Sequence, residues 1–287
     1  MSESIIKPLP LLFGQRQSLK RAVFAFFLLS LGALLLSCST DPGGVVFDKA
    51  EKQYSMGDVA SALSQYQYVV DKHPESVAAP TSQYRIAQIY NHNLGDRKKA
   101  LEAYSTLYFM YPNAPETIDA RVDLAVIYAS NSEHRLAIEQ YQKLLTERPS
   151  QYAKFQYLIA MEYIMLNDFK QARVEFIELL SRASGELVPE VEYQIANTFY
   201  IEGNLDDAME RYRKLIANHP ESPFALNAKL GIAKSLSETG MLSEAMAVLK
   251  ELKDKYPNKD AVTVMINAVQ VRLDEAPGSK SHATAKN

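Results

Sequence analysis

The chain contains no tryptophan and a single cysteine, Cys38, among its 287 residues. One thiol cannot form an intrachain disulfide, and it cannot supply the several cysteines of a structural zinc site. The H-E-x-x-H zinc motif, the phosphate-binding glycine loop and the G-x-S-x-G nucleophile motif are also missing. We therefore predict that the protein is not an enzyme and has no metal or other bound cofactor. A carbohydrate-handling solenoid is the alternative class, since tyrosines can stack on sugars, although no acidic cluster accompanies them.

Charge is absent from residues 22–36, a run of fifteen residues that follows a basic segment. The basic residues of that segment are Lys7, Arg16, Lys20 and Arg21. A basic segment, an apolar run and a small residue before a break are typical of a secretory signal. The alternative is an uncleaved membrane anchor, but fifteen helical residues span only about 22 Å, short of the roughly 30 Å of a bilayer core.

Cys38 directly follows this run, in the order Leu35-Leu36-Ser37-Cys38, and the arrangement resembles a bacterial lipobox. The resemblance implies a signal peptide over residues 1–37, cleavage before Cys38, and lipid on the Cys38 thiol and on the new amino group. Residues 38–44 would then form a lipidated linker. Several acyl chains on one residue give stable membrane attachment, whereas a single chain is marginal.

Basic charge is in deficit in the remaining chain. Removing residues 1–37 takes away four basic residues and one acidic one, which leaves 27 Lys and Arg against 33 Asp and Glu, a net charge of −6. Nucleic-acid binding requires a basic surface, so we predict no nucleic-acid partner. The same deficit argues against a polybasic membrane patch.

A three-residue pattern recurs six times along the chain. An alanine is followed four residues later by an aromatic residue or leucine, and three residues after that by an aliphatic one, which places all three on one helix face. Successive alanines lie 38, 37, 35, 36 and 37 residues apart. The six triplets are Ala62-Tyr66-Val69, Ala100-Tyr104-Leu107, Ala137-Tyr141-Leu144, Ala172-Phe176-Leu179, Ala208-Tyr212-Leu215 and Ala245-Leu249-Leu252.

A second alanine precedes each triplet by 12 residues, or by 13 in the second repeat. Between the two alanines lies a turn sequence such as Gly57-Asp58 or Asn167-Asp168, whose Gly or Asn tolerates the left-handed backbone that ends a helix. Each repeat is therefore predicted to be helix A, a tight turn and helix B, with the alanines allowing close approach. The upstream alanines are Ala50, Ala87, Ala125, Ala160, Ala196 and Ala233.

Helix B meets a proline five residues after its last apolar position in five repeats, and proline stops a helix. The paired alanines, Gly-Asp turns, helix B aromatics and terminal prolines together resemble the tetratricopeptide repeat over residues 45–258. The resemblance implies an all-α, right-handed superhelical solenoid of six repeats. Their expected bounds are 45–76, 77–114, 115–150, 151–185, 186–222 and 223–258.

Helical spacing continues after the sixth repeat through Val262, Ile266, Val269 and Leu273, although Val262, Val264 and Ile266 also alternate as a strand would. A solenoid must cover the apolar face of its last repeat, so we predict a capping helix over residues 259–275. Residues 276–287 are small and polar and are predicted to be a disordered tail.

The family resemblance assigns the inner, concave face of the solenoid to helix A. The residues at these offsets are apolar and aromatic in the middle repeats, which suits capture of a peptide. Several of them, Met161 and Ile164 above all, could instead pack against neighbouring repeats. The predicted binding groove comprises Val126, Tyr157, Met161, Ile164, Met165, Tyr193, Asn197, Tyr200 and Ile201.

These features resemble lipid-anchored tetratricopeptide-repeat proteins of the bacterial envelope. The texture is similar to BamD-type lipoproteins of β-barrel assembly, whose repeats close with Pro-x-Ser, here Pro74-Glu75-Ser76 and Pro220-Glu221-Ser222. The alternatives are pilotins of type IV pilus secretins and the cell-division coordinator CpoB. Ser39 after the lipidated cysteine, where aspartate would retain a lipoprotein at the inner membrane, implies the periplasmic face of the outer membrane. The expected partners are envelope proteins, either β-barrel assembly components or a secretin.

Overall fold

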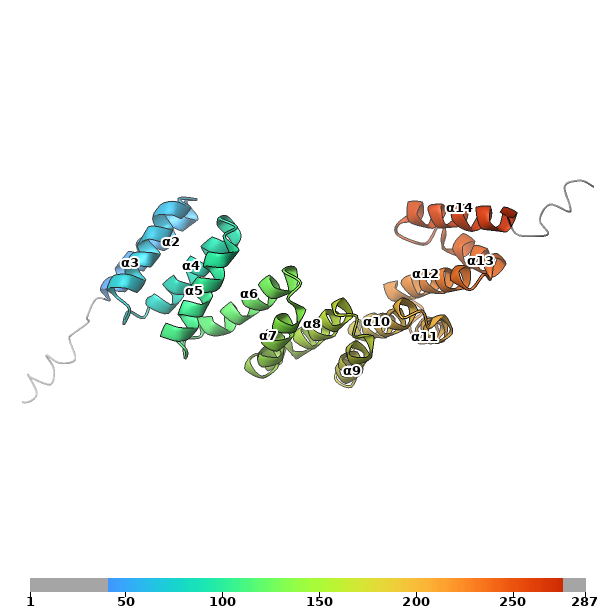
Figure 1. Cartoon of the computed structure of the whole chain (residues 1–287), viewed down its shortest axis with the longest axis horizontal. Helices are drawn as coiled ribbons and strands as arrows, with labels where there is room; N and C mark the ends of the chain where they lie inside the picture. Colours follow the sequence, from blue (N-terminus) through green and yellow to red (C-terminus); the bar gives the residue numbers. More distant parts are fainter. Residues whose placement is uncertain (1–40, 276–287) are drawn as a thin grey trace, which may run out of the picture. The chain divides into compact units, whose positions relative to one another are not determined.

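The computed structural model describes residues 41–275, which form thirteen α-helices, one π-helical turn and one 3-10 turn (Figure 1). The expected signal peptide, Cys38 and the tail over 276–287 lie outside these residues. The elements are α2 (Pro42–Ser55), α3 (Val59–Lys72), α4 (Ala79–Gln88), η1 (Ile89–Asn93), α5 (Arg97–Met110), α6 (Glu116–Ser130), α7 (His134–Glu147), η2 (Pro149–Gln151), α8 (Tyr152–Met165), α9 (Phe169–Leu180), α10 (Leu187–Ile201), α11 (Leu205–Asn218), α12 (Pro223–Glu238), α13 (Leu242–Leu252) and α14 (Lys259–Glu275).

The chain divides into two compact units between Asp96 and Arg97. Unit 1 contains α2, α3, α4 and η1, and unit 2 contains α5 to α14. Within each unit consecutive helices pack against each other in antiparallel hairpins (Figure 1). The division falls between the two helices of the second repeat, where the repeat pattern itself shows no break.

The repeated alanines are buried, as the close helix packing predicted from the sequence requires. All twelve, from Ala50 to Ala245, are completely buried. The aromatic or leucine position of helix B is equally buried, with Tyr66, Tyr104 and Phe176 at 0% exposure. A larger residue at an alanine position would overpack its helix pair at a cost of about 1–3 kcal/mol.

The turn between helices A and B has one left-handed residue in every repeat. It is glycine in four repeats, Asn167 in the fourth and Ser132 in the third. We expected Gly or Asn at these turns, so Ser132 with φ 62° is a departure, since its neighbour Asn131 has φ −89°. A non-glycine residue in this region carries a steric cost.

The extra residue of the second repeat is accommodated by η1. A π-turn bonds residue i+5 to residue i, and here the Leu94 N–H donates to the Ile89 carbonyl at 3.0 Å. The Asp96 N–H then reaches back six residues to Tyr90, whereas the equivalent Asp58 N–H reaches back five to Gln53. The π-turn thus accommodates the extra residue of the 13-residue alanine spacing within the helix. The turn that follows still has a left-handed glycine, Gly95.

Helix α2 begins at Pro42, within the segment expected to be a linker. Asp41 caps the helix by accepting from the Gly43 N–H at 3.1 Å, and Pro42 occupies the first helical position. The expected linker bounds of 38–44 are therefore wrong at their end, because the cap and the packing of Gly43 against Ser76 place residues 42–44 in the helix.

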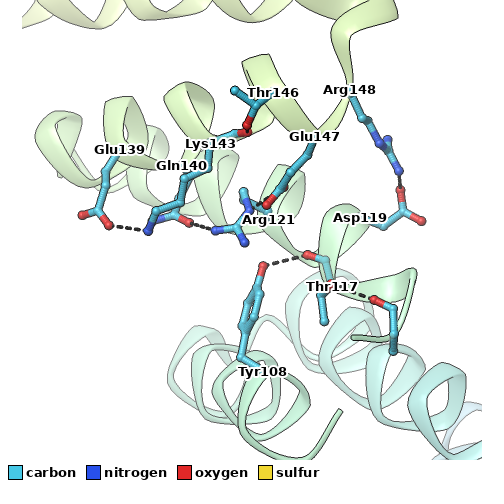
Figure 2. Close-up of polar contacts among 11 residues, drawn as sticks. Tyr108, Thr117, Asp119, Arg121, Glu139, Gln140, Lys143, Thr146, Glu147 and Arg148 are labelled. Carbon is cyan, nitrogen blue, oxygen red and sulfur yellow. Dashed lines mark hydrogen bonds and ion pairs between the residues drawn. The ribbon is translucent and has the colours of Figure 1, made fainter. Parts of the chain in front are cut away.

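Unit 2 carries a polar network where α5, α6 and α7 meet (Figure 2). Arg121 on α6 donates to Glu147 at 2.8 Å and to Gln140 at 3.1 Å, and its guanidinium lies 5.3 Å from the ring centroid of Tyr108. Tyr108 in turn donates to the Thr117 carbonyl at 2.7 Å. These contacts tie the polar edges of three successive helices together.

The last helix, α14, packs on α13 through Val262 and Val269, and Arg272 donates to Ser237 of α12 at 2.7 Å. Of the described residues, none belongs to a helix that is both long and apolar enough to cross a bilayer.

Candidate functional site

The nine residues predicted to bind a partner lie on α6, α8 and α10, the A helices of the third to fifth repeats, all within unit 2. We call this set the A-helix face. Three of its side chains are exposed: Val126 is 55% exposed, Met165 60% and Ile201 48%. Met165 and Ile201 each follow the repeat alanine of their helix by five residues, so they occupy equivalent positions on successive A helices.

The other apolar members of the A-helix face are half-buried. Tyr157, Met161 and Ile164 pack on the cluster around Phe176, and Tyr193 and Tyr200 pack on the cluster that contains Tyr212. The ring of Tyr193 lies 5.8 Å from that of Tyr212 and 5.9 Å from that of Phe224. Packing between repeats therefore accounts for much of the apolar character of this face, and the exposed trio provides its free apolar area.

Hydrogen bonds link the A helices of successive repeats. Gln194 on α10 donates to the Tyr157 hydroxyl on α8 at 3.1 Å, and the Tyr200 hydroxyl donates to Glu238 on α12. Tyr54 and Asn93 form the equivalent link in unit 1, at 3.2 Å. Asn197 accepts a longer bond, 3.5 Å, from the Tyr212 hydroxyl.

The tyrosines of this face stay neutral well above neutral pH. Burial raises the pKa of Tyr157 to about 12, with a further contribution from the nearby Glu190 carboxylate. Burial and then the hydrogen bond to Glu238 raise the pKa of Tyr200 to about 12. Both hydroxyls therefore act as hydrogen-bonding groups and not as acids or bases.

The sequence analysis missed two side-chain contacts in and near this site. Gln194 lies 37 residues after Tyr157, one repeat period away, and that spacing could have identified the pair. His134 and Glu162 form a nearly buried contact of 2.7 Å between α7 and α8, with side-chain exposures of 11% and 10%. No sequence motif marks that pair, because it depends on how two repeats stack. Across residues 41–275 no three His, Cys, Asp or Glu side chains gather as metal ligands.

Comparison with known proteins identifies the repeat. Models of the tetratricopeptide repeat match residues 47–115, 93–152 and 199–265. The TPR repeat-containing protein YpiA of Bacillus subtilis is 24% identical over 176 residues, which cover 61% of this chain and 40% of that protein. The photosystem I assembly protein Ycf3 of Prochlorococcus marinus is 39% identical over 59 residues, 21% of this chain and 34% of that protein. The chain spans less than half the length of these curated relatives.

A solved tetratricopeptide-repeat protein from Parabacteroides merdae has a similar fold, with a TM-score of 0.54. The alignment covers 81% of this chain and 87% of that structure, at 19% sequence identity. At this identity the likeness extends to the fold alone.

Proposed function

Because the chain is a tetratricopeptide-repeat protein, a scaffold for protein–protein interaction, we propose that it is a lipid-anchored scaffold of the bacterial envelope. Its A-helix face would bind a segment of an envelope protein, with outer-membrane β-barrel assembly as the first candidate process. Scaffolds of this repeat family are generally not enzymes, and we propose no catalytic step.

The exposure of Val126, Met165 and Ile201 on successive A helices is the observation that supports a binding role. Fully burying one such aliphatic side chain contributes about 1.5–3 kcal/mol. Three of them, spaced one per repeat, suit an extended or helical segment that crosses several repeats. Half-buried tyrosines beside them add amphipathic contact area of the kind found at interfaces.

The envelope location is supported by the signal-like N-terminus and the lipobox around Cys38. A lipid on Cys38 would hold the scaffold at the periplasmic face of the outer membrane, directed there by Ser39. Confinement to the membrane raises the effective concentration of the scaffold near membrane partners without any new contact.

A secretin is the second candidate partner, because the repeat pattern occurs six times in the sequence, which resembles the repeat count of pilotins. A cell-wall coordinator of the CpoB type is a third candidate from the sequence. All three share one binding surface and differ in whose segment it holds.

In-cell photo-crosslinking from Ile201 would test the binding face. The matched control is Val174, which is 55% exposed on the B helix α9 of the same unit. We expect a specific protein adduct from position 201 and none from position 174. Identification of the adduct as a β-barrel assembly component or as a secretin decides between the first two candidates.

The second experiment places the crosslinker at the third exposed position, Val126. In a double Met165→Glu, Ile201→Glu variant this crosslinker should no longer capture the partner that it captures in the parent, while helicity is retained. Tyr200 is a poor site for such a test, since replacing it breaks the bond to Glu238. Equal adducts from positions 201 and 174 in a folded protein would contradict the assignment of the A-helix face.

A further inference from the structure

The start of α2 is held against the turn between α3 and α4. Ser76 in that turn donates from its hydroxyl to Asp41 at 2.6 Å, and the same hydroxyl accepts from the Ala78 N–H at 3.1 Å. Asp41 also caps α2 through the Gly43 N–H. The Asp41 carboxylate thus connects the first turn of α2 to the turn between α3 and α4.

The backbone at this point is as close to the turn as glycine allows. A Cβ on Gly43 would lie 2.4 Å from the Ser76 Cβ and 3.0 Å from the His73 Cβ. The position at which the chain enters unit 1 is therefore fixed by both packing and hydrogen bonding.

Cys38 precedes Asp41 by only three residues. A fully extended chain spans at most about 3.6 Å per residue, so three residues reach about 11 Å. Whatever holds Cys38 at a bilayer surface must also bring the start of α2 to within roughly that distance of the surface.

This end of unit 1 exposes apolar and aromatic side chains. Antiparallel packing places the start of α2, the end of α3 and the start of α4 together. Val77 in the turn is 89% exposed, Val45 in the first turn of α2 is 65% exposed, and Tyr68 near the end of α3 is 48% exposed. We call this the tether end, and it includes Lys72 and Glu75 at its rim.

We propose that the tether end of unit 1 rests on the phospholipid surface, with Val77 and Val45 at headgroup depth and Tyr68 beside them. The inference depends on the lipidation of Cys38 in the proposed function. Tyrosine suits the boundary between lipid and water because its ring is apolar and its hydroxyl is wet. Helices α2, α3 and α4 would then run away from the bilayer, with Met56 at the far end of α2.

The charges at the tether end indicate that the lipid on Cys38, and not electrostatic attraction to anionic lipid, would hold this end at the bilayer. Asp41, Asp71 and Glu75 outnumber Lys72, so no basic cluster is present to attract anionic lipid. The contact should therefore be insensitive to the fraction of anionic lipid, unlike that of a polybasic segment.

Headgroup quenching in vesicles tests this orientation. The full lipidated chain would carry one environment-sensitive fluorescent amino acid, at Val77 or at Met56, in phosphatidylethanolamine vesicles containing nitroxide-headgroup lipid. Met56 is the matched control because it is 74% exposed in the same unit and about 20 Å away at about 1.5 Å per helical residue. We expect quenching several-fold stronger at position 77, unchanged when phosphatidylglycerol is added.

Equal quenching at the two positions, in a chain whose intact mass shows the lipid and which floats with vesicles, would overturn the tether-end contact and leave the anchor standing. A chain without lipid would overturn both. Quenching at position 77 that appears only with phosphatidylglycerol would also overturn the proposal, since it would indicate electrostatic attraction.

Discussion

Ser132 and Asn167 are the two left-handed turn residues of the described chain that are not glycine, and asparagine is enriched in this backbone region whereas serine is not. The Ser132 φ of 62° is left-handed, as at the glycines of four other repeats. A left-handed L-residue costs about 1–2 kcal/mol, and the greater chain entropy lost by glycine offsets about 0.5–1 kcal/mol. Ser132→Gly should therefore raise the free energy of unfolding by about 0.5–1 kcal/mol, measured by urea denaturation.

Glu133→Gly provides the control for this turn. Glu133 has φ −87° and caps α7 without a side-chain hydrogen bond, so glycine relieves no left-handed strain there and the change should be near neutral. The converse change, Gly203→Ala at a φ of 82°, should lower the free energy of unfolding. A stabilising Glu133→Gly would show that loop flexibility, and not the sign of φ, governs these turns.

Gly231 is a second position where adding a single Cβ atom should change the stability. A Cβ there would lie 2.6 Å from two ring carbons of the fully packed Tyr212. Alanine gains up to about 1 kcal/mol in helix propensity, but overpacking costs about 1–3 kcal/mol, so we expect Gly231→Ala to destabilise by about 1 kcal/mol. Urea denaturation would measure this, with exposed Lys234→Ala on the same helix as the control.

A second substitution that enlarges the space beside Gly231 can show whether steric overlap causes the loss of stability in Gly231→Ala. Tyr212→Leu removes the ring atoms that the new methyl group would meet, so Gly231→Ala should cost less in that background. Equal costs in the two backgrounds would contradict the steric explanation.

At the scale of elements, the sequence predicts the A and B helices of the repeats well, because each repeat has the same spacing of small and large residues. The alanines at the crossing points and the large residue four positions later are buried as their spacing requires. The helical spacing of Val262 and Val269 likewise identifies the face of α14 that packs inward. Recurrence makes these signals readable, since six weak patterns in one register support each other.

Features that depend on contacts between elements were not predictable in this way. The closeness of Gly43 to Ser76, and of Gly231 to Tyr212, arises from how helices pack and leaves only a glycine in the sequence. The contact between His134 and Glu162 requires the stacking of two repeats and has no sequence motif. The half-burial of most of the A-helix face has the same origin, because its tyrosines also serve the core.

Tyrosines packed in both A and B helices give the stability of the fold a dependence on alkaline pH. Burial raises the pKa of Tyr141 to about 12 and that of Tyr157 on α8 similarly, against 10.0 for an unperturbed phenol. The native state therefore keeps these protons when the unfolded chain has lost them. Stability is fully present below pH 10.0 and should fall as pH rises towards 12, by on the order of 1–2 kcal/mol per tyrosine.

Unfolding by urea at increasing pH would measure this loss, and Tyr141→Phe is the matched variant. Phenylalanine keeps the ring that stacks at 6.2 Å on Phe155 and removes the ionisable hydroxyl. The variant should show a shallower alkaline decline than the parent. Identical slopes would mean that Tyr141 does not contribute.

At the scale of the whole molecule, the proposed function joins the A-helix face in unit 2 to a membrane through a lipid on Cys38, ahead of unit 1. In this proposal the exposed Val126, Met165 and Ile201 would bind a partner segment without any contribution from the lipid. The lipid would act on concentration and orientation alone. Anchoring and binding should therefore be separable by mutation.

Cys38→Ala tests the anchor without touching the folded residues. Lipid attachment requires the thiol, so the variant should leave the membrane fraction, while its circular dichroism matches that of the parent. Its intact mass should lack the lipid, and the Met165→Glu, Ile201→Glu variant should retain it. Unchanged membrane retention of Cys38→Ala, with residues 1–37 still present by mass, would instead establish the uncleaved anchor, because only a segment independent of the thiol could then hold the chain at the bilayer.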